Sequence, residues 1–134
     1  MPVTFDSVLQ GEEYDRPTLA SLWGYQSWNA LGRGIVTPAN EKTIVLFVTK
    51  EKQETLTQYE DHFDGDTLHM EGETNHSHDD RLVNAGRIGD QVHLFYRERH
   101  HSSFTYFGEV WLVHSSIHQD KPSRFVFSTI RSWN

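Results

Sequence analysis

The sequence contains no cysteine, which excludes a disulfide framework and any metal site built on thiolates. No apolar run approaches the roughly 20 residues that a membrane-spanning helix needs. The first residues, MPVTFDSVLQGEE, have neither a basic start nor an apolar block, so they do not resemble a secretory signal. We therefore expect a cytoplasmic protein that has no membrane partner.

The usual catalytic signatures are also missing. The sequence has no G-x-S-x-G motif, no glycine-rich loop for phosphate groups and no HExxH motif. Its nine histidines are many for this length, but none has the spacing of a catalytic triad. The residues therefore give no positive argument for an enzyme, and we expect neither a catalytic residue nor a cofactor.

Basic residues are outnumbered, and the net charge of the chain is −7. This excess of acid argues against nonspecific binding to nucleic acid. The charge is uneven, because residues 1–80 carry 15 acidic and 5 basic side chains, whereas residues 81–134 carry 4 acidic and 7 basic ones. An acidic half joined to a basic half permits one basic face despite the overall sign.

The length of 134 residues suits a single domain, residues 1–134, with a core of its own. Short apolar runs separated by turn residues predict about seven strands, and two further segments predict short helices. The pattern favours an α+β, mainly β fold, in the form of a small, closed, mixed β-barrel. The expected strands are Val3–Leu9, Thr43–Val48, Tyr59–Phe63, Thr67–Glu71, Val92–Tyr96, Phe104–Val113 and Arg124–Ile130.

The first expected helix begins after Asp15, which is a suitable N-cap, and has Pro17 in its first turn. Gly24 is a suitable residue to follow its end. The spacing of three apolar residues predicts one buried face, which consists of Leu19, Leu22 and Trp23.

The longest apolar stretch, Val92–Val113, reads as a hairpin of two strands. Alternation places Val92, Leu94 and Tyr96 on one face of its first strand. In the second strand it places Phe104, Tyr106, Val110 and Leu112 together, opposite Phe107, Trp111 and Val113. The joining loop carries Arg97, Arg99, His100 and His101 and forms a cationic cluster at the tip, which suits contact with phosphate groups.

An acidic and histidine-rich segment, Glu71–Ala85, precedes this hairpin. Ser77 is a possible cap for a short helix over His78–Ala85, which we expect to stop at Gly86. A metal site would need His76, His78, Asp79 and Glu71 or Glu73 to converge. A metal-dependent nuclease or hydrolase built on this cluster is an alternative hypothesis, although Asp79 and Asp80 also suit the first turn of a helix.

Aromatic and acidic side chains together indicate a binding function. Tyr25 and Trp28 lie on a glycine-flanked stretch, where they either form a ligand wall or plug the end of a barrel. A pocket for a nucleic-acid base needs planar walls and hydrogen-bonding groups for the base edge. Candidates for the walls are Trp23, Tyr25, Trp28 and Tyr59, and candidates for the edge are Asp61, Glu71 and Glu73.

Several short motifs occur in an order that resembles a known domain family. They are Tyr14-Asp15-Arg16, Gly24-Tyr25, Phe47-Val48-Thr49-Lys50, Tyr59-Glu60-Asp61, His93–Arg97 with Phe104–Val110, and Lys121-Pro122-Ser123 before Phe125. The chain resembles the uncharacterised C-terminal domain of bacterial superfamily-two helicases and phospholipase-D-type modification-dependent restriction enzymes. Relatives often carry an aromatic residue near Met70, so we do not assign that methionine to a base cage.

The resemblance implies a barrel of the PUA-like or SRA-like group, whose members read modified bases by base flipping. It leads us to expect a noncatalytic domain that binds modified, methylated DNA in a restriction or phage-defence system, with a nuclease or helicase module in cis or in trans. In that hypothesis the base is bound by Trp23, Tyr25, Trp28, Tyr59, Asp61 and Glu71, and phosphates by Arg97, Arg99, His100 and His101. A protein-interaction module of a defence system is a further alternative.

Overall fold

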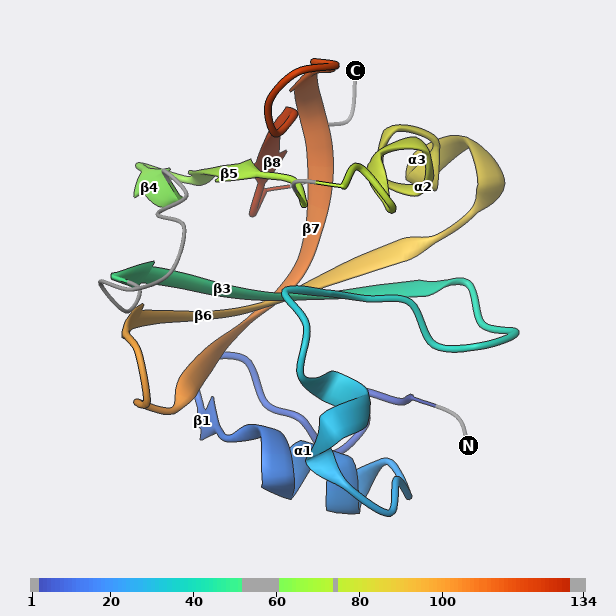
Figure 1. Cartoon of the computed structure of the whole chain (residues 1–134). Coiled ribbons are helices and arrows are strands. Elements are labelled where there is room, and N and C mark those ends of the chain that lie inside the picture. Colours follow the sequence, from blue (N-terminus) through green and yellow to red (C-terminus); the bar gives the residue numbers. More distant parts are fainter. Residues whose placement is uncertain (1–2, 52–60, 74, 131–134) are drawn as a thin grey trace.

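The computed structural model describes residues 3–51, 61–73 and 75–130 and shows a mixed sheet with a few short helices (Figure 1). The α+β, mainly β prediction is therefore confirmed. The strands are β1 (Glu13–Tyr14), β2 (Ile35–Val36), β3 (Thr43–Glu51), β4 (His62–Asp64), β5 (Thr67–Glu71), β6 (Gln91–Arg99), β7 (Phe104–Ser116) and β8 (Arg124–Ser128). The helices are α1 (Arg16–Leu22), the 3₁₀ turn η1 (Trp28–Leu31), α2 (Asp79–Val83) and α3 (Ala85–Ile88).

The strands follow the order β2-β3-β6-β7-β8-β5-β4, with β1 added beside β7. Only β3 and β6 run parallel among the described pairs, and their register places Thr43 opposite Gln91. Within the described ranges, β2 and β4 lie at opposite ends of this order and do not pair, so the closed barrel that we expected is not formed. The expected strand Val3–Leu9 is also absent, since this segment forms loop and turn.

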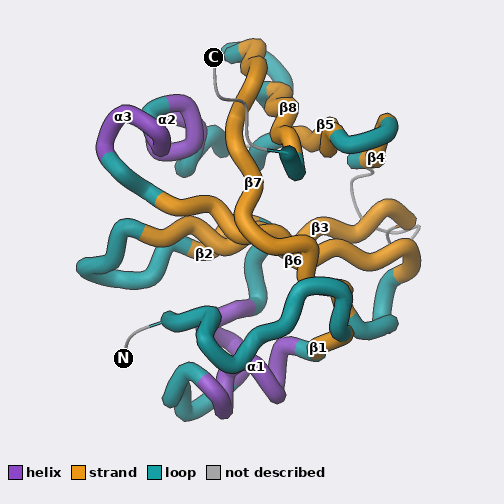
Figure 2. Tube along the Cα trace, turned by 180° about the vertical axis from the view of Figure 1, so that it is seen from behind, coloured by secondary structure: helices purple, strands orange, loops and turns teal. Residues whose placement is uncertain are grey.

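Strand β7 is long enough to belong to both halves of the sheet, and a bulge divides it. Leu94 pairs with Gly108 but Phe95 pairs with Tyr106, so Phe107 is an extra residue. Gly108 adopts a φ of 90°, which favours glycine and is typical of such bulges. Figure 2 shows β7 running from β6 toward β8.

The bulge reverses the side-chain alternation of β7, and this corrects the expected faces. Phe104 and Tyr106 pack in one core, but Val110 and Leu112 pack in the other, together with Phe107. An inserted residue shifts a period of two by one position, which a strict alternation count cannot anticipate.

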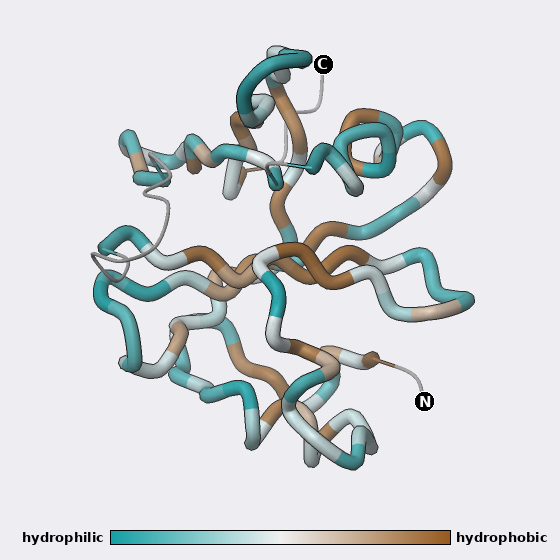
Figure 3. Tube along the Cα trace, viewed as in Figure 1, coloured by the Kyte–Doolittle hydropathy of each residue, from teal (hydrophilic) through white to brown (hydrophobic). Residues whose placement is uncertain are grey.

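The β3–β6 pair lies between two hydrophobic cores. Val45 and Phe47 face the core beneath α1, whereas Ile44, Leu46 and Val48 face the core beneath β5 and β8. The apolar run Thr43–Val48 is therefore covered on both faces, as predicted. Figure 3 shows this apolar band at the centre of the molecule.

Helix α1 confirms the capping signals. The Asp15 side chain accepts a hydrogen bond of 2.8 Å from the Thr18 amide, and Gly24 has a φ of 80° just beyond the helix end. Leu22 was wrongly placed in the buried face, because it is 45% exposed and Ala20 is buried instead. The buried residues Leu19, Ala20 and Trp23 share one arc of the helix, and Leu22 lies outside this arc.

The other local predictions are partly confirmed. The Asp64-Gly65-Asp66 hairpin forms between β4 and β5. The helix expected over His78–Ala85 begins at Asp79, without a side-chain cap, and a second short helix continues past Gly86 to a left-handed Gly89. No helix in the described ranges is long and apolar enough to span a membrane.

Candidate functional site

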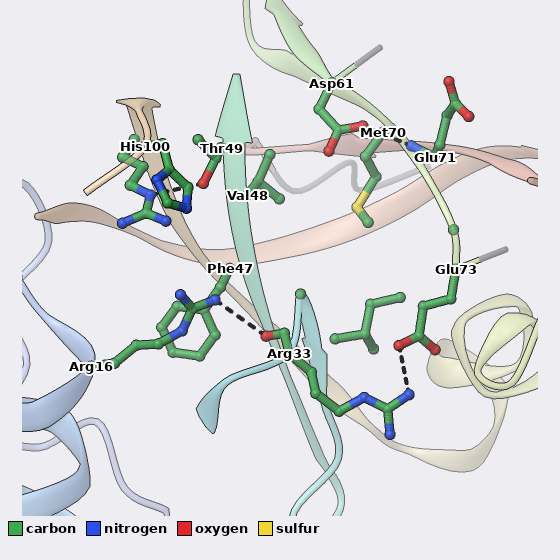
Figure 4. Close-up of a pocket in the computed structure, with 14 residues that line it drawn as sticks. Arg16, Arg33, Phe47, Val48, Thr49, Asp61, Met70, Glu71, Glu73 and His100 are labelled. Atoms are coloured by element: carbon green, nitrogen blue, oxygen red, sulfur yellow. Dashed lines mark hydrogen bonds and ion pairs between the residues drawn. The ribbon is translucent and has the colours of Figure 1, made fainter. Parts of the chain in front are cut away.

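A cavity of about 390 Å³ opens where the ends of β3 and β6 approach the end of β5, and we call it the first cavity. One wall is cationic and consists of Arg16, Arg97 and His100. The opposite wall is acidic and consists of Asp61, Glu71 and Glu73. Figure 4 shows Asp61 and Glu71 on one side of β3, and Arg16 and His100 on the other.

Arg16 is the first residue of α1, and its side chain reaches over the end of β3. Its Nε donates a 2.6 Å hydrogen bond to the Leu31 carbonyl oxygen. The guanidinium lies 4.8 Å from the centre of the Phe47 ring and 5.0 Å from that of Phe104. Burial, together with the positive charge of Arg97, lowers the pKa of Arg16 to about 10. The group remains a cation at neutral pH, but it is poorly hydrated.

Arg97 lies beside it, near the end of β6, and stands opposite Thr49 in the register with β3. Its Nε donates to the Thr49 hydroxyl at 2.8 Å, and its Nη1 donates to the Ser102 carbonyl oxygen at 2.9 Å. The guanidinium stacks over Phe104 at 4.2 Å, and burial lowers its pKa. The ring of Phe104 therefore contacts two guanidinium groups, which come from segments far apart in the sequence.

His100 completes the cationic wall. Its Nδ1 atom is buried and has no hydrogen-bond partner among the described residues. Partial burial, followed by the charges of His101, Arg97 and Arg16, lowers the pKa of the imidazole. A buried polar atom without a partner gains free energy when a ligand or a water supplies one.

The acidic wall contains two kinds of carboxylate. Asp61, which is only 7% exposed, directly precedes β4 and accepts a 3.0 Å hydrogen bond from the Glu71 amide. Glu73 instead pairs with Arg33 at 2.9 Å and also accepts from Ser77. Burial raises the pKa of Glu73, but hydrogen bonds from Ser77 and His78 and the nearby charges outweigh it and lower the pKa overall.

Apolar side chains line the first cavity between these walls. They belong to Ile35, Phe47, Val48 and Met70. Met70 was not assigned to a site from the sequence. The expectation that family relatives carry an aromatic residue near this position was a signal that the position lines the cavity. Arg16 was also missed, even though it lies in the Tyr14-Asp15-Arg16 motif.

Four of the predicted site residues meet at the first cavity: Asp61, Glu71, Arg97 and His100. Arg99 does not join them, because its side chain is 81% exposed and lies 3.8 Å from Glu51. His101 lines a second cavity of about 310 Å³, which lies on the other side of Arg16 and Arg97. The cationic loop is thus divided between two cavities and the solvent.

The predicted aromatic residues do not converge. Trp23 is 2% exposed, and its Nε1 donates to the Thr4 carbonyl oxygen, so it belongs to the core. Tyr25 lines a separate cavity of about 270 Å³, and Trp28, which is 48% exposed, lines the second cavity. Tyr59 lies outside the described residues, so its predicted place in the pocket stays a prediction.

The histidine cluster is divided between two carboxylates. His76 pairs with Asp79 at 2.8 Å, while His78 pairs with Glu73. The Ser123 hydroxyl also donates to Asp79 at 2.6 Å, which places the carboxylate, rather than an imidazole, at the centre of the network. Among residues 3–51, 61–73 and 75–130 no group of three such side chains could hold a metal ion. The metal-dependent alternative therefore has no support in this part of the chain.

Comparison with protein families gives a match that spans most of the chain. A family described as a domain of unknown function, DUF3427, matches residues 8–126. No curated protein matches the chain. The matched range includes all the described residues of both walls.

Proposed function

We propose that this chain, which belongs to the DUF3427 family, is a noncatalytic DNA-binding domain that holds a modified base in the first cavity. The observation that carries the proposal is the meeting of Asp61, Glu71, Arg97 and His100 at one cavity. A nucleotide has an anionic backbone and a base edge, and the cavity offers groups of complementary charge for each.

The dimensions and the acidic wall favour a nucleobase that carries an amino group. The volume of about 390 Å³ lies within the range of small-molecule pockets, roughly 300–1,000 Å³. Carboxylates accept hydrogen bonds from exocyclic amines, so Asp61 and Glu71 would face the edge of a cytosine or an adenine. A methyl group on that base would contact the apolar lining at Val48 and Met70.

Stacking is the remaining requirement. The guanidinium of Arg16 supplies a planar group on the cavity wall, whereas Phe47 is 5% exposed and its ring already packs against Arg16 and Phe95. Trp28 in the second cavity would stack on a neighbouring base or fill the gap that a flipped base leaves. Tyr59 precedes Asp61 by two positions and remains our predicted further wall.

The wider context is part of the same proposal. The mainly β fold, with its open sheet, is compatible with a divergent PUA-like or SRA-like domain that does not close into a barrel. By that resemblance the domain would act in the cytoplasm as the reader of a restriction or defence system. A nuclease module, in cis or in trans, would then cut the DNA, or a helicase module would unwind it.

Fluorescence anisotropy on matched modified and unmodified duplexes, at two salt concentrations, tests the proposal. We expect tighter binding to a duplex that carries methylated cytosine or adenine, and affinity that falls with salt with a slope near ~0.9 per phosphate contact. Asp61→Asn should mainly reduce the discrimination, by about tenfold, since an amide can present its donor instead of an acceptor.

Asp64→Asn is the matched control, because Asp64 lies in the exposed hairpin turn and does not line the first cavity. It should bind both duplexes as the wild type does. Equal binding of the wild type to modified and unmodified DNA, or to neither, would refute the reader function.

A further inference from the structure

We infer that Arg16 and Arg97, stacked about Phe104, form one binding site for a single phosphate group. The inference deepens the proposed function and rests on it only for the source of that phosphate, a nucleotide whose base enters the first cavity. It adds Arg16 to the expected phosphate ligands and removes Arg99 from them.

The two guanidinium groups are held in place by bonds that leave donors available. Arg16 is anchored through Nε and Nη2, so its Nη1 makes no hydrogen bond with the described residues. Arg97 is anchored through Nε and Nη1, so its Nη2 is likewise unused. Anchored arginines with unused terminal donors can bind an oxyanion at little entropic cost.

The positive charge of this pair is not balanced within the described part of the chain. Among the described arginines, Arg33, Arg81 and Arg99 form ion pairs with Glu73, Asp90 and Glu51. Neither Arg16 nor Arg97 forms one, although both are partly buried. Two neighbouring, poorly hydrated cations repel each other, and a bound anion would relieve this repulsion.

A third donor lies at the same place. His100 lines the first cavity, and its buried Nδ1 has no partner among the described residues. An imidazole can donate from Nδ1 in either its cationic form or one neutral tautomer. His100 would therefore complete the set of donors around the anion.

The position of the pair identifies the phosphate as one that joins two nucleotides. Arg16 and Arg97 line both the first cavity and the second cavity. A phosphate between them would connect a base near Asp61 to a neighbouring base near Trp28. The two cavities thus provide places for consecutive nucleotides of one strand.

Thermal unfolding measured during titration with inorganic phosphate tests the site, with chloride at equal ionic strength as the reference. We expect a saturable rise in Tm for the wild type. Arg16→Met and Arg97→Met should each weaken phosphate binding by about tenfold. Arg99→Met should respond as the wild type does, and so should Arg87→Met, the control on the distant helix α3.

A second arm of the test compares the binding of deoxycytidine monophosphate with that of deoxycytidine. The monophosphate should bind at least about tenfold more tightly than the nucleoside, and Arg97→Met should abolish this difference. If a methionine variant does not fold, Arg97→Lys is compared with the wild type instead, and phosphate binding is followed by ³¹P line broadening. The lysine variant should bind phosphate more weakly, because lysine lacks the planar guanidinium fork.

The inference fails if the wild type shows no saturable response to phosphate, or if Arg16→Met and Arg97→Met respond as strongly as it does. The failure can be separated from that of the proposed function. Phosphate binding without preference for modified DNA would refute only the reader function. Preference for modified DNA that persists unchanged in both arginine variants, without phosphate binding, would refute only this site.

Discussion

Two groups of polar side chains reach the first cavity, one through Arg33 and Glu73 and the other through Arg16 and Arg97, and they differ in how their charges are balanced. The paired group consists of Arg33, Glu73, His76, His78, Asp79 and Ser123. Glu73 accepts a hydrogen bond from Ser77 and pairs with Arg33 and His78. Asp79 bonds to both His76 and Ser123 through Oδ2, while its buried Oδ1 has no partner among the described residues. These bonds link the segment after β5, α2 and the residue before β8. The unpaired group is Arg16 and Arg97, which no described carboxylate neutralises.

The difference teaches how to separate structural from ligand-binding residues in this fold. A group whose charges are paired with one another has little charge left to offer a ligand, even though Asp79 Oδ1 has no partner among the described residues. Cations that remain unbalanced on a cavity wall cost stability and gain from a ligand of opposite charge. By residue type alone, the histidine-rich group was the better candidate for chemistry, and its pairing shows why it is the weaker one.

Removal of the Asp79 carboxylate, at the centre of the paired group, should have the largest effect on stability. Asp79→Ala leaves the fully buried Ser123 hydroxyl and the His76 imidazole without their acceptor. We expect the free energy of unfolding to fall by about 2–4 kcal/mol, measured by urea denaturation. Phosphate and DNA binding by the folded fraction should be unchanged.

Asp80→Ala is the matched control for this variant, since Asp80 is the exposed neighbour in the same first turn of α2. It should lose less than about 1 kcal/mol, which is the usual size of a helix-dipole interaction. Equal losses for the two variants would contradict the assignment of the network to Asp79.

A smaller effect is expected at Glu73. Glu73→Gln removes the charge that pairs with Arg33 and His78, and should cost about 1 kcal/mol at pH 7. The folded-state pKa of Glu73 lies below its usual value of 4.5, so its contribution is present above pH 4.5 and is lost as the pH falls through the folded value.

Urea unfolding of the wild type and Glu73→Gln at pH 7 and near pH 3 therefore measures the pair directly. The difference in unfolding free energy should be smaller at the lower pH, because the carboxylate is increasingly protonated there. Glu98→Gln, whose side chain is 70% exposed, should show no such difference at either pH. If the difference in unfolding free energy between the wild type and Glu73→Gln were the same in acid, the charge of Glu73 would not contribute to stability.

The smallest effect on stability is expected in the unpaired group. Arg97→Met without any anion should change the unfolding free energy by less than about 1 kcal/mol, since the loss of two hydrogen bonds is offset by relief of repulsion from Arg16. Chemical denaturation in phosphate-free buffer measures this. A loss above about 2 kcal/mol would place Arg97 among the structural residues and remove the contrast between the groups.

Local features of the structure could be predicted well from the sequence. Asp15 and Gly24 delimit α1 through bonds and dihedral angles that involve only a few neighbouring residues. The turn at Asp64-Gly65-Asp66 and the doubly covered strand Thr43–Val48 follow from composition and hydrophobic pattern over short windows. Each depends on interactions that reach only a few residues along the chain.

The candidate site could be predicted only in part. Asp61, Glu71, Arg97 and His100 were chosen by chemical type, and the fold brings them to one cavity. Tyr25 and Trp28 were chosen for the same reason, and the fold separates them. Chemical type identifies groups that could bind a ligand, but it contains no information on which of them meet.

The sequence by itself determined the strands β3, β5, β6 and β7, the caps of α1, the turn before β5, and the excess of aromatic and acidic side chains. Only the tertiary structure decided that β7 changes face at Gly108, that the sheet stays open, and that Arg16 meets Arg97 over Phe104. The reason is that elements depend on local backbone and periodic preferences, whereas sites depend on strand register and on contacts between distant segments.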